Sequence, residues 1–312
     1  MTVEDWLGKD NTLGISIWEK KYRHNNESFD EWLDRVSGKD TDVRNLIQSK
    51  AFLFGGRILS NRGITDRKTT LSNCYVLTVE DSIESIYQCC SDIARTYSYG
   101  GGVGVDISKL RPRGAFVNNS AKETTGAVSF MKTFDTVTST IGQSGRRGAL
   151  MLSIDVRHPD VEEFINIKAN TDQITSANIS VRVNDDFMSA VEHDEDYILR
   201  WPCDVDLSKF TKEYKDCPYN TLTYLEDHTD NNKIFYIKKV KARDLFNQLV
   251  KNNWNYAEPG ILYWDQIENW NKKKKNEDFE YAGINPCAEE PLVAGGACLL
   301  GAMNISYYVR DK

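Results

Sequence analysis

The sequence predicts an α/β fold with largely parallel strand pairing. From about residue 70 onward, short apolar segments typical of strands alternate with segments whose apolar residues recur at helical spacing. ALMLSID (149–155) and ANISVRV (177–183) are the clearest strands, and both are apolar enough to be buried on two faces. Residues 14–50 differ, because they contain helical patterns only.

The N-terminal helical region is marked by a capping box. Ser28 and Glu31 form an S-x-x-E pattern immediately before the apolar residues of a helix. A second short helix is expected over 42–50, with Val43, Leu46 and Ile47 on one face.

A glycine-rich segment separates the next two expected helices. LSNCYVLTV (71–79) is β-rich, and a helix capped by Asp81 and Ser82 follows to residue 97. The glycines at 100–104 follow a helix, so they fit a helix C-cap and fail the context of a dinucleotide-binding loop. A loop is expected up to residue 126, and a helix over 128–141.

The remaining elements alternate in the same way. A helix begins near Pro159, and Asn184 caps another. Residues 203–235 are polar and predict either a surface insertion or a β-meander. Further expected elements are a helix at 242–255, a strand at 260–264, a helix after it, and a solvated loop at the lysine run 272–275.

Composition excludes several classes of protein. Hydrophobic residues make up 40% and charged residues 27%, which excludes bulk disorder. The net charge of −7 disfavours a general nucleic-acid binder. No apolar run approaches the length of a membrane span. The opening MTVEDWLGKD is not a secretory signal, so a cytoplasmic location with reduced cysteines is expected.

The seven cysteines include no CxxC pair, and the chain has four histidines, so a zinc site is not expected. The strongest chemical pattern is Asn285-Pro-Cys287-Ala-Glu289. In an extended segment, these alternate side chains would face one pocket and combine an amide, a thiol and a carboxyl. The alternative is a buried cysteine in a loop with two exposed polar neighbours.

Two more cysteines and two basic clusters remain open to interpretation. Cys74 and Cys298 lie in apolar, strand-like settings, which suits core residues or a pair that cycles between dithiol and disulfide. One basic cluster contains Lys109, Arg111 and Arg113, and the other contains Arg146 and Arg147 between glycines. Both suit phosphate binding or a solvated basic loop.

Taken together, the motifs resemble the large catalytic subunit of ribonucleotide reductase. The matching stretches span about residues 50–308 in the family's order. They are FLFGGRILSNRG, LSNCYVL, DSIESI, GGGVGVDISKLRPRGA, TTGAVSFMKTFDTVTSTIGQSGRRGALMLSIDVRHPDVEEFI, YAEPGILYWD and NPCAEEPLVAGGACLLGAMNIS.

The resemblance implies roles for individual residues. Cys287 would become the thiyl radical that abstracts the substrate's 3′-hydrogen, Glu289 would deprotonate the 3′-hydroxyl, and Asn285 would orient the ribose hydroxyls. Cys74 and Cys298 would be the redox pair that ends as a disulfide. Asp81, Lys109 and Arg111 would bind an allosteric nucleotide, and Arg147 would contact substrate. The two effector loops would be 112–126 and 145–150.

The resemblance also implies an architecture. Residues 1–50 would form a short helical region without a full ATP-cone. Residues 51–312 would form the first half of a ten-stranded ribonucleotide-reductase-type α/β barrel, incomplete at its C-terminus. A second chain with the remaining strands is therefore expected as a partner, and this chain alone is expected to be inactive.

The implied reaction is the radical reduction of ribonucleoside diphosphates to 2′-deoxyribonucleotides. Implied partners are the ribonucleotide substrate, deoxynucleoside triphosphate or ATP effectors, a radical-generating small subunit, and a thioredoxin- or glutaredoxin-type reductant. A homodimer is expected, no cofactor is expected to bind directly, and no membrane is involved. The alternatives are an adenosylcobalamin-dependent reductase and a non-catalytic nucleotide-binding fragment; a glycyl-radical enzyme fits the loops less well.

Overall fold

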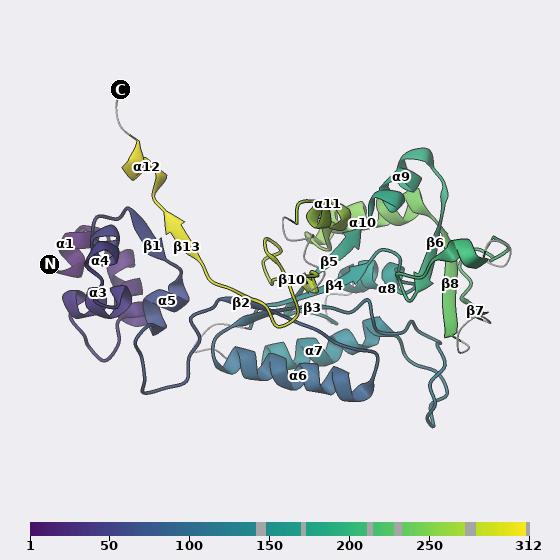
Figure 1. Ribbon diagram of the computed structural model, residues 1–312, viewed down its shortest axis with the longest axis horizontal. Helices are drawn as coiled ribbons and strands as arrows, with labels where there is room; N and C mark the ends of the chain where they lie inside the picture. Colours follow the sequence, from purple (N-terminus) through teal and green to yellow (C-terminus); the bar gives the residue numbers. More distant parts are fainter. Residues whose placement is uncertain (142–147, 170–172, 211–214, 228–232, 272–278, 310–312) are drawn as a thin grey trace. The chain divides into compact units, whose positions relative to one another are not determined.

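The computed structural model describes residues 1–141, 148–169, 173–210, 215–227, 233–271 and 279–309 (Figure 1). The chain forms two compact units. The first contains Met1–Cys74, Tyr99–Gly101 and Ala297–Lys312, and the second contains Tyr75–Ser98 and Gly102–Gly296. The expected division between residues 50 and 51 stays a prediction.

The first unit is mainly helical. Aromatic side chains form its core, with Phe29 stacked on Trp32 and Trp18 edge-on to both. Its elements are α1 (Val3–Leu7), α2 (Thr12–Ile17), the π-helical turn η1 (Trp18–Tyr22), α3 (Phe29–Ser37), α4 (Thr41–Gln48), β1 (Phe52–Phe54), α5 (Gly56–Asn61), β12 (Ala297–Cys298), β13 (Gly301–Met303) and α12 (Ile305–Tyr308). Strands β1 and β13 pair antiparallel.

The predicted capping box at α3 is confirmed. The Ser28 hydroxyl accepts the N–H of Glu31, and the Glu31 carboxylate accepts the N–H of Ser28 at 2.7 Å. Helix α4 begins one residue earlier than predicted. Ile47 is buried as expected, whereas Leu46 is 41% exposed, so the predicted apolar face is narrower than its spacing indicates.

The second unit is built on a parallel sheet, which confirms the predicted α/β fold. Its strands follow the order β2-β3-β4-β5-β9, and β3/β4, β4/β5 and β5/β9 are parallel pairs. The strands and main helices are β2 (Cys74–Leu77), α6 (Ile83–Ser98), β3 (Gly102–Asp106), α7 (Ala127–Thr140), β4 (Leu150–Asp155), α8 (Val161–Asn166), β5 (Ala177–Val183), α10 (Ala242–Tyr256), β9 (Gly260–Tyr263) and α11 (Trp264–Asn269).

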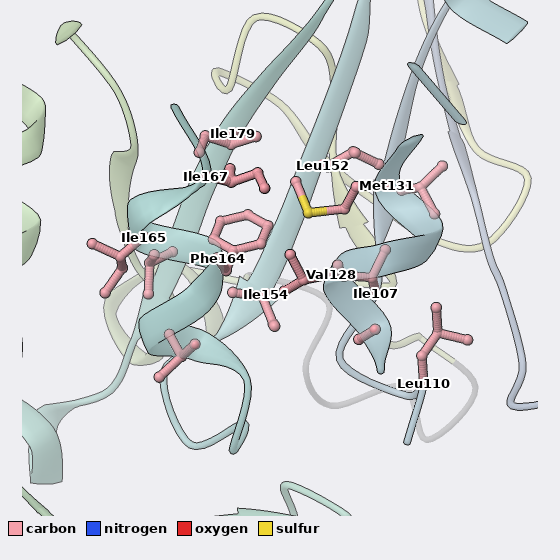
Figure 2. Packing of buried hydrophobic residues seen from close by; sticks show 14 of the residues in the cluster. Ile107, Leu110, Val128, Met131, Leu152, Ile154, Phe164, Ile165, Ile167 and Ile179 are labelled. Atoms are coloured by element: carbon pink, nitrogen blue, oxygen red, sulfur yellow. The ribbon is translucent and has the colours of Figure 1, made fainter. Parts of the chain in front are cut away.

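The two faces of this sheet are covered by different segments of the chain. Figure 2 shows side chains of α7 and α8, including Met131 and Phe164, gathered around Leu152 and Ile154 of β4. Met151, one residue away on β4, belongs instead to a small cluster with Leu262 and Ile284. Because neighbouring strand residues point to opposite faces, helices α7 and α8 cover one face and the segment that contains Ile284 lies on the other.

Strand β3 was not predicted, because its sequence GVGVD reads as part of a glycine-rich loop. The structure explains the glycine. A Cβ atom at Gly104 would collide with the carbonyl oxygen of Ile284. A glycine therefore lets the backbone of Ile284 approach the sheet closely.

A separate antiparallel sheet has the order β6-β8-β7. The β-meander, one of the two alternatives for residues 203–235, is wrong, because β8 lies between β6 and β7 and consecutive strands of a meander would be neighbours. The edge strand β6 had not been predicted at all. The elements that complete the second unit are η2 (Ile167–Ala169), α9 (Asp185–His193), β6 (Asp196–Trp201), η3 (Leu207–Phe210), β7 (Thr223–Asp227), β8 (Lys233–Lys241), β10 (Gly283–Ile284) and β11 (Pro291–Leu292).

Most helices predicted after residue 70 lie where expected. Asn184 caps α9 by accepting the N–H of Phe187. The lysine run 272–275 lies outside the described residues. Within the ranges that the structure describes, no helix is both long and apolar enough to cross a membrane.

Candidate functional site

The segment with Asn285, Cys287 and Glu289 is a tight turn between β10 and β11. These two short strands pair antiparallel, with Ile284 opposite Pro291. The N–H of Asn285 donates to the carbonyl of Glu290 at 3.1 Å, and Ala288 has a φ of +64°. The expected extended conformation is therefore wrong, since the chain reverses direction within the motif.

The three side chains of the motif differ in their burial. Asn285 is fully buried, whereas Cys287 and Glu289 are exposed. The Asn285 side-chain oxygen accepts the N–H groups of Glu289 and Glu290, both at 3.0 Å. Asn285 therefore fixes the backbone of the turn and leaves Cys287 at its surface. The alternative of a buried cysteine with two exposed polar neighbours is wrong too, because Cys287 is exposed and Asn285 is buried.

The Asn285 amide nitrogen gives the turn an unused donor. This atom is buried and makes no hydrogen bond within the described part of the chain. Leaving a buried donor unpaired costs about 1–3 kcal/mol, so such atoms are rare unless another group meets them. The turn is also tied to the sheet, because the Asn178 side chain of β5 donates to the carbonyl of Pro286 at 3.4 Å.

A backbone hydrogen bond in the first unit brings together the segments that contain Cys74 and Cys298. The N–H of Asn73 donates to the carbonyl of Cys298 at 2.9 Å. Cys74 is buried and Cys298 is half-buried. The structure therefore brings these two predicted residues into neighbouring segments; their pairing as a disulfide stays a prediction.

The structure also brings Asp81 and Arg111 together. The Asp81 carboxylate accepts the backbone N–H of Arg111 at 3.0 Å and its Nε at 2.7 Å. Both residues line a cavity of about 200 Å³ at the start of α6. The wall of this cavity is largely apolar and includes Ile83, Ile86, Leu110, Val117 and Phe130. Such a mixture of an ion pair and apolar side chains suits a small molecule with both a charged and a flat apolar part.

Two other predicted nucleotide contacts are placed differently. Lys109 forms an exposed ion pair with Glu80 at 2.5 Å and lines a different cavity. Its assignment as a phosphate contact stays a prediction. Arg147 lies outside the described residues, as does most of the expected loop 145–150.

The cavity that Lys109 lines is larger, at about 960 Å³, and lies at the carboxyl ends of β3, β4 and β5. Asp106 forms an ion pair with Arg182 at 3.1 Å. The Arg182 guanidinium carbon lies 3.8 Å from the centre of the Trp264 ring. Burial raises the pKa of Cys203 well above its usual range, so this thiol is held neutral. Nothing in the sequence had pointed to this group of residues.

Sequence reasoning also missed His158 and Asp160. In the sequence Pro159 indicates a helix start, and no pattern assigns a role to its polar neighbours. In the structure both are buried, and burial raises the pKa of Asp160 and lowers the pKa of His158. His158 contacts Leu110, and Asp160 contacts both ends of loop 112–126.

In the ranges that the structure describes, no group of three or more histidine, cysteine, aspartate or glutamate side chains is arranged to hold a metal ion.

Comparison with known proteins identifies relatives over most of the chain. The family model described as "Ribonucleotide reductase, barrel domain" matches residues 72–312. The chain is 35% identical over 294 residues to a vitamin B12-dependent ribonucleoside-diphosphate reductase of Thermoplasma acidophilum, which covers 91% of the chain and 34% of that protein.

Two further relatives have related descriptions. A vitamin B12-dependent ribonucleoside-diphosphate reductase of Mycobacterium tuberculosis is 30% identical over 90% of the chain and 35% of that protein. A ribonucleoside-diphosphate reductase subunit alpha of a Synechocystis species is 31% identical over 76% of the chain and 32% of that protein. The chain thus spans about a third of the length of these curated relatives.

Proposed function

Since this chain belongs to the ribonucleotide reductase family through its barrel domain, we propose that it acts in the radical reduction of ribonucleoside diphosphates to 2′-deoxyribonucleotides. The observation that carries the proposal is the turn at 285–290. It presents a thiol and a carboxylate on its surface, and a buried asparagine with a spare donor fixes its backbone.

We propose the following roles for the turn. Cys287 as a thiyl radical takes the hydrogen atom from C3′ and later returns one, because an S–H bond is weak enough for exchange with a ribose C–H. Glu289 takes the proton of the 3′-hydroxyl. Asn285 donates its amide N–H to a ribose hydroxyl, which would give that buried donor its missing partner.

The reducing electrons come from Cys74 and Cys298 in this proposal. The 2′-hydroxyl leaves as water and hydrogen replaces it, so the substrate gains two electrons. The two thiols lose two electrons and form a disulfide. An external dithiol protein of the thioredoxin or glutaredoxin type then reduces the disulfide by thiol–disulfide exchange.

The radical source is proposed from the names of the relatives. Relatives described as vitamin B12-dependent favour adenosylcobalamin, which supplies a carbon-centred radical when bound, over a radical-generating small subunit. The three cavities beside Arg113, Arg111 and Lys109 are not lined by Cys287, Asn285 or Glu289. These three cavities therefore provide no corrinoid site beside the thiol.

The test of the radical source is an activity assay of the enzyme that contains this chain. We expect deoxynucleotide formation from a ribonucleoside diphosphate and a dithiol only when adenosylcobalamin is added. Product formation without adenosylcobalamin, but with an added small subunit, would favour the other radical source. Substrate binding without turnover under both conditions would support the remaining alternative, a non-catalytic nucleotide-binding protein.

We further propose that the cavity beside Asp81 and Arg111 binds a deoxynucleoside triphosphate or ATP as an allosteric effector. The apolar wall would hold the base, and Arg111 would hold a phosphate. We propose a homodimer and a cytoplasmic location as well; the buried neutral thiols Cys89 and Cys90 are compatible with a reducing compartment.

Arg111→Ala is expected to weaken effector binding by about ten- to hundredfold, because it removes a charge-assisted phosphate contact. It also leaves the Asp81 carboxylate without its cation, and this negative charge would repel the phosphates. Isothermal titration calorimetry with deoxynucleoside triphosphates measures the change. Arg95→Ala is the matched control, since Arg95 lies exposed in the last turn of the same helix α6 and does not line this cavity, so its loss should change affinity less. Equal affinities for wild type and Arg111→Ala would reject the effector site.

A further inference from the structure

Loop 112–126, which carries the chain away from Arg111, is closed on itself as a hairpin. The N–H of Gly114 donates to Thr124, that of Thr124 donates to Ala115, and that of Val117 donates to Lys122, at distances of 2.8–3.0 Å. Nothing in this internal ladder fixes the hairpin to the rest of the second unit. That attachment comes from Phe116, whose N–H donates to the Tyr236 hydroxyl at 2.8 Å, and from the two ends of the loop.

Both ends of the loop meet one carboxylate. Asp160, which is 7% exposed, accepts the N–H of Arg113 at 3.1 Å with each of its oxygens. It also accepts the N–H of Ala127 at 3.0 Å. Arg113 begins the hairpin and Ala127 directly follows it. A single buried side chain thus holds the entry and the exit of the loop together.

The contact with Ala127 is also a helix cap. Ala127 is the first residue of α7, and the N-cap position is Gly126, which has no side chain to offer. Asp160 supplies the missing acceptor from a different segment of the chain, and its negative charge lies at the positive end of the helix. Helix α7 and the hairpin therefore share one anchor.

Gly126 leaves the space that the Asp160 carboxylate occupies. Its φ is +90°, and a Cβ atom there would lie 2.6 Å from a carboxylate oxygen of Asp160 and 2.7 Å from the backbone nitrogen of Arg113. Any side chain at this position would separate the carboxylate from the N–H groups that it accepts. The glycine and the aspartate are thus two halves of one arrangement.

His158 extends the anchor to the other side of Arg111. Its ring is fully buried; one nitrogen contacts the carbonyl of Leu110 at 2.8 Å, and the other accepts the N–H of Asp160 at 3.0 Å. Segment 158–160 therefore holds the residue before Arg111 and the loop after it. Arg111 lies between these fixed points, where its guanidinium meets Asp81.

We infer that Asp160 is a positioning residue of the effector cavity: its carboxylate clamps the two ends of loop 112–126 and so presents Arg111 beside Asp81. The inference rests on the proposed effector function of that cavity. Asp160 does not need to touch the nucleotide, since its action passes through the backbone of Arg113 and Ala127.

The test compares Asp160→Asn with Glu163→Gln in the enzyme that contains this chain. The asparagine has one acceptor oxygen in place of two, and its NH₂ group would face N–H donors. Among the described residues, Glu163 accepts hydrogen bonds from the side chain of Arg113 and not from the backbone of either loop end, so Glu163→Gln leaves the clamp intact. We expect Asp160→Asn to bind deoxynucleoside triphosphates about tenfold more weakly in calorimetry, and Glu163→Gln to bind them within about twofold of wild type.

Hydrogen exchange measured without nucleotide tests the clamp independently of function. The amides of Arg113 and Ala127 should exchange faster in Asp160→Asn than in wild type, and Gly126→Ala should give the same pattern if the aspartate variant does not fold. Unchanged exchange in the folded variants, or equal effector affinity for wild type and Asp160→Asn, would overturn the inference. Failure of the wild type to bind any nucleotide would instead refute the effector site, while faster exchange would still support the clamp.

Discussion

Cys287→Ser is expected to abolish deoxynucleotide formation while substrate binding stays within about twofold of wild type. Cys287 lies exposed on the turn between β10 and β11, and it is the neighbouring Asn285 that fixes the backbone. A serine should therefore fit without disturbing the turn. It cannot replace the thiol chemically, because an O–H bond is too strong to exchange a hydrogen atom with a ribose C–H. Chromatography of the nucleotides after incubation measures the product.

Cys217→Ser provides the control for this prediction. Cys217 is buried in the core of the β6-β8-β7 sheet, in a cluster with Leu225, Phe235 and Ile237. Its substitution should lower stability while leaving the reaction itself possible. If the Cys287→Ser variant formed substantial product, the thiyl assignment would be wrong.

A disulfide between Cys74 and Cys298 is expected after turnover without added reductant. The backbone hydrogen bond between Asn73 and Cys298 places the segments of Cys74 and Cys298 side by side. This is compatible with the Cα separation of below about 7 Å that a disulfide requires. Cys74→Ser or Cys298→Ser should therefore stop repeated turnover, since the two electrons then have no dithiol source.

Alkylation followed by peptide mass spectrometry measures this disulfide. When samples are denatured before alkylation, both thiols should be alkylated before turnover and protected after it, and a dithiol should restore their reactivity. Cys89 and Cys90, next to each other in buried positions of α6, should be alkylated after denaturation in both samples. Two alkylated thiols at Cys74 and Cys298 after turnover would contradict the redox-pair proposal.

The elements that could be predicted are those whose own residues decide their structure. Strands β4 and β5 are apolar enough to be recognised alone, and Ser28 and Glu31 carry the cap of α3 within four residues. Strand β3 could not be predicted, because its Gly104 is required by the close approach of the Ile284 backbone, which lies far along the sequence. Strand β6 is likewise stabilised by β8, which lies far along the sequence.

The residues of the candidate site could be named from the sequence, but their geometry could not. Spacing singled out Asn285, Cys287 and Glu289, yet the turn depends on backbone hydrogen bonds to Glu290 that no periodicity encodes. Asp81 and Arg111 form an ion pair, and their assignment to one nucleotide site stays a prediction. The anchor at Asp160 was invisible, because its partners are backbone N–H groups more than thirty residues away.

The most direct test of thiol-driven ribonucleotide reduction is the ratio of deoxynucleotide to disulfide in a single reaction without external reductant. Chromatography gives the deoxynucleotide, and alkylation with mass spectrometry gives the Cys74–Cys298 disulfide in the same sample. The account predicts that both form in equal amounts, because each product takes two electrons from one pair of thiols. Deoxynucleotide formation with both thiols still reduced, or a folded enzyme that binds ribonucleotide and forms neither product, would contradict it.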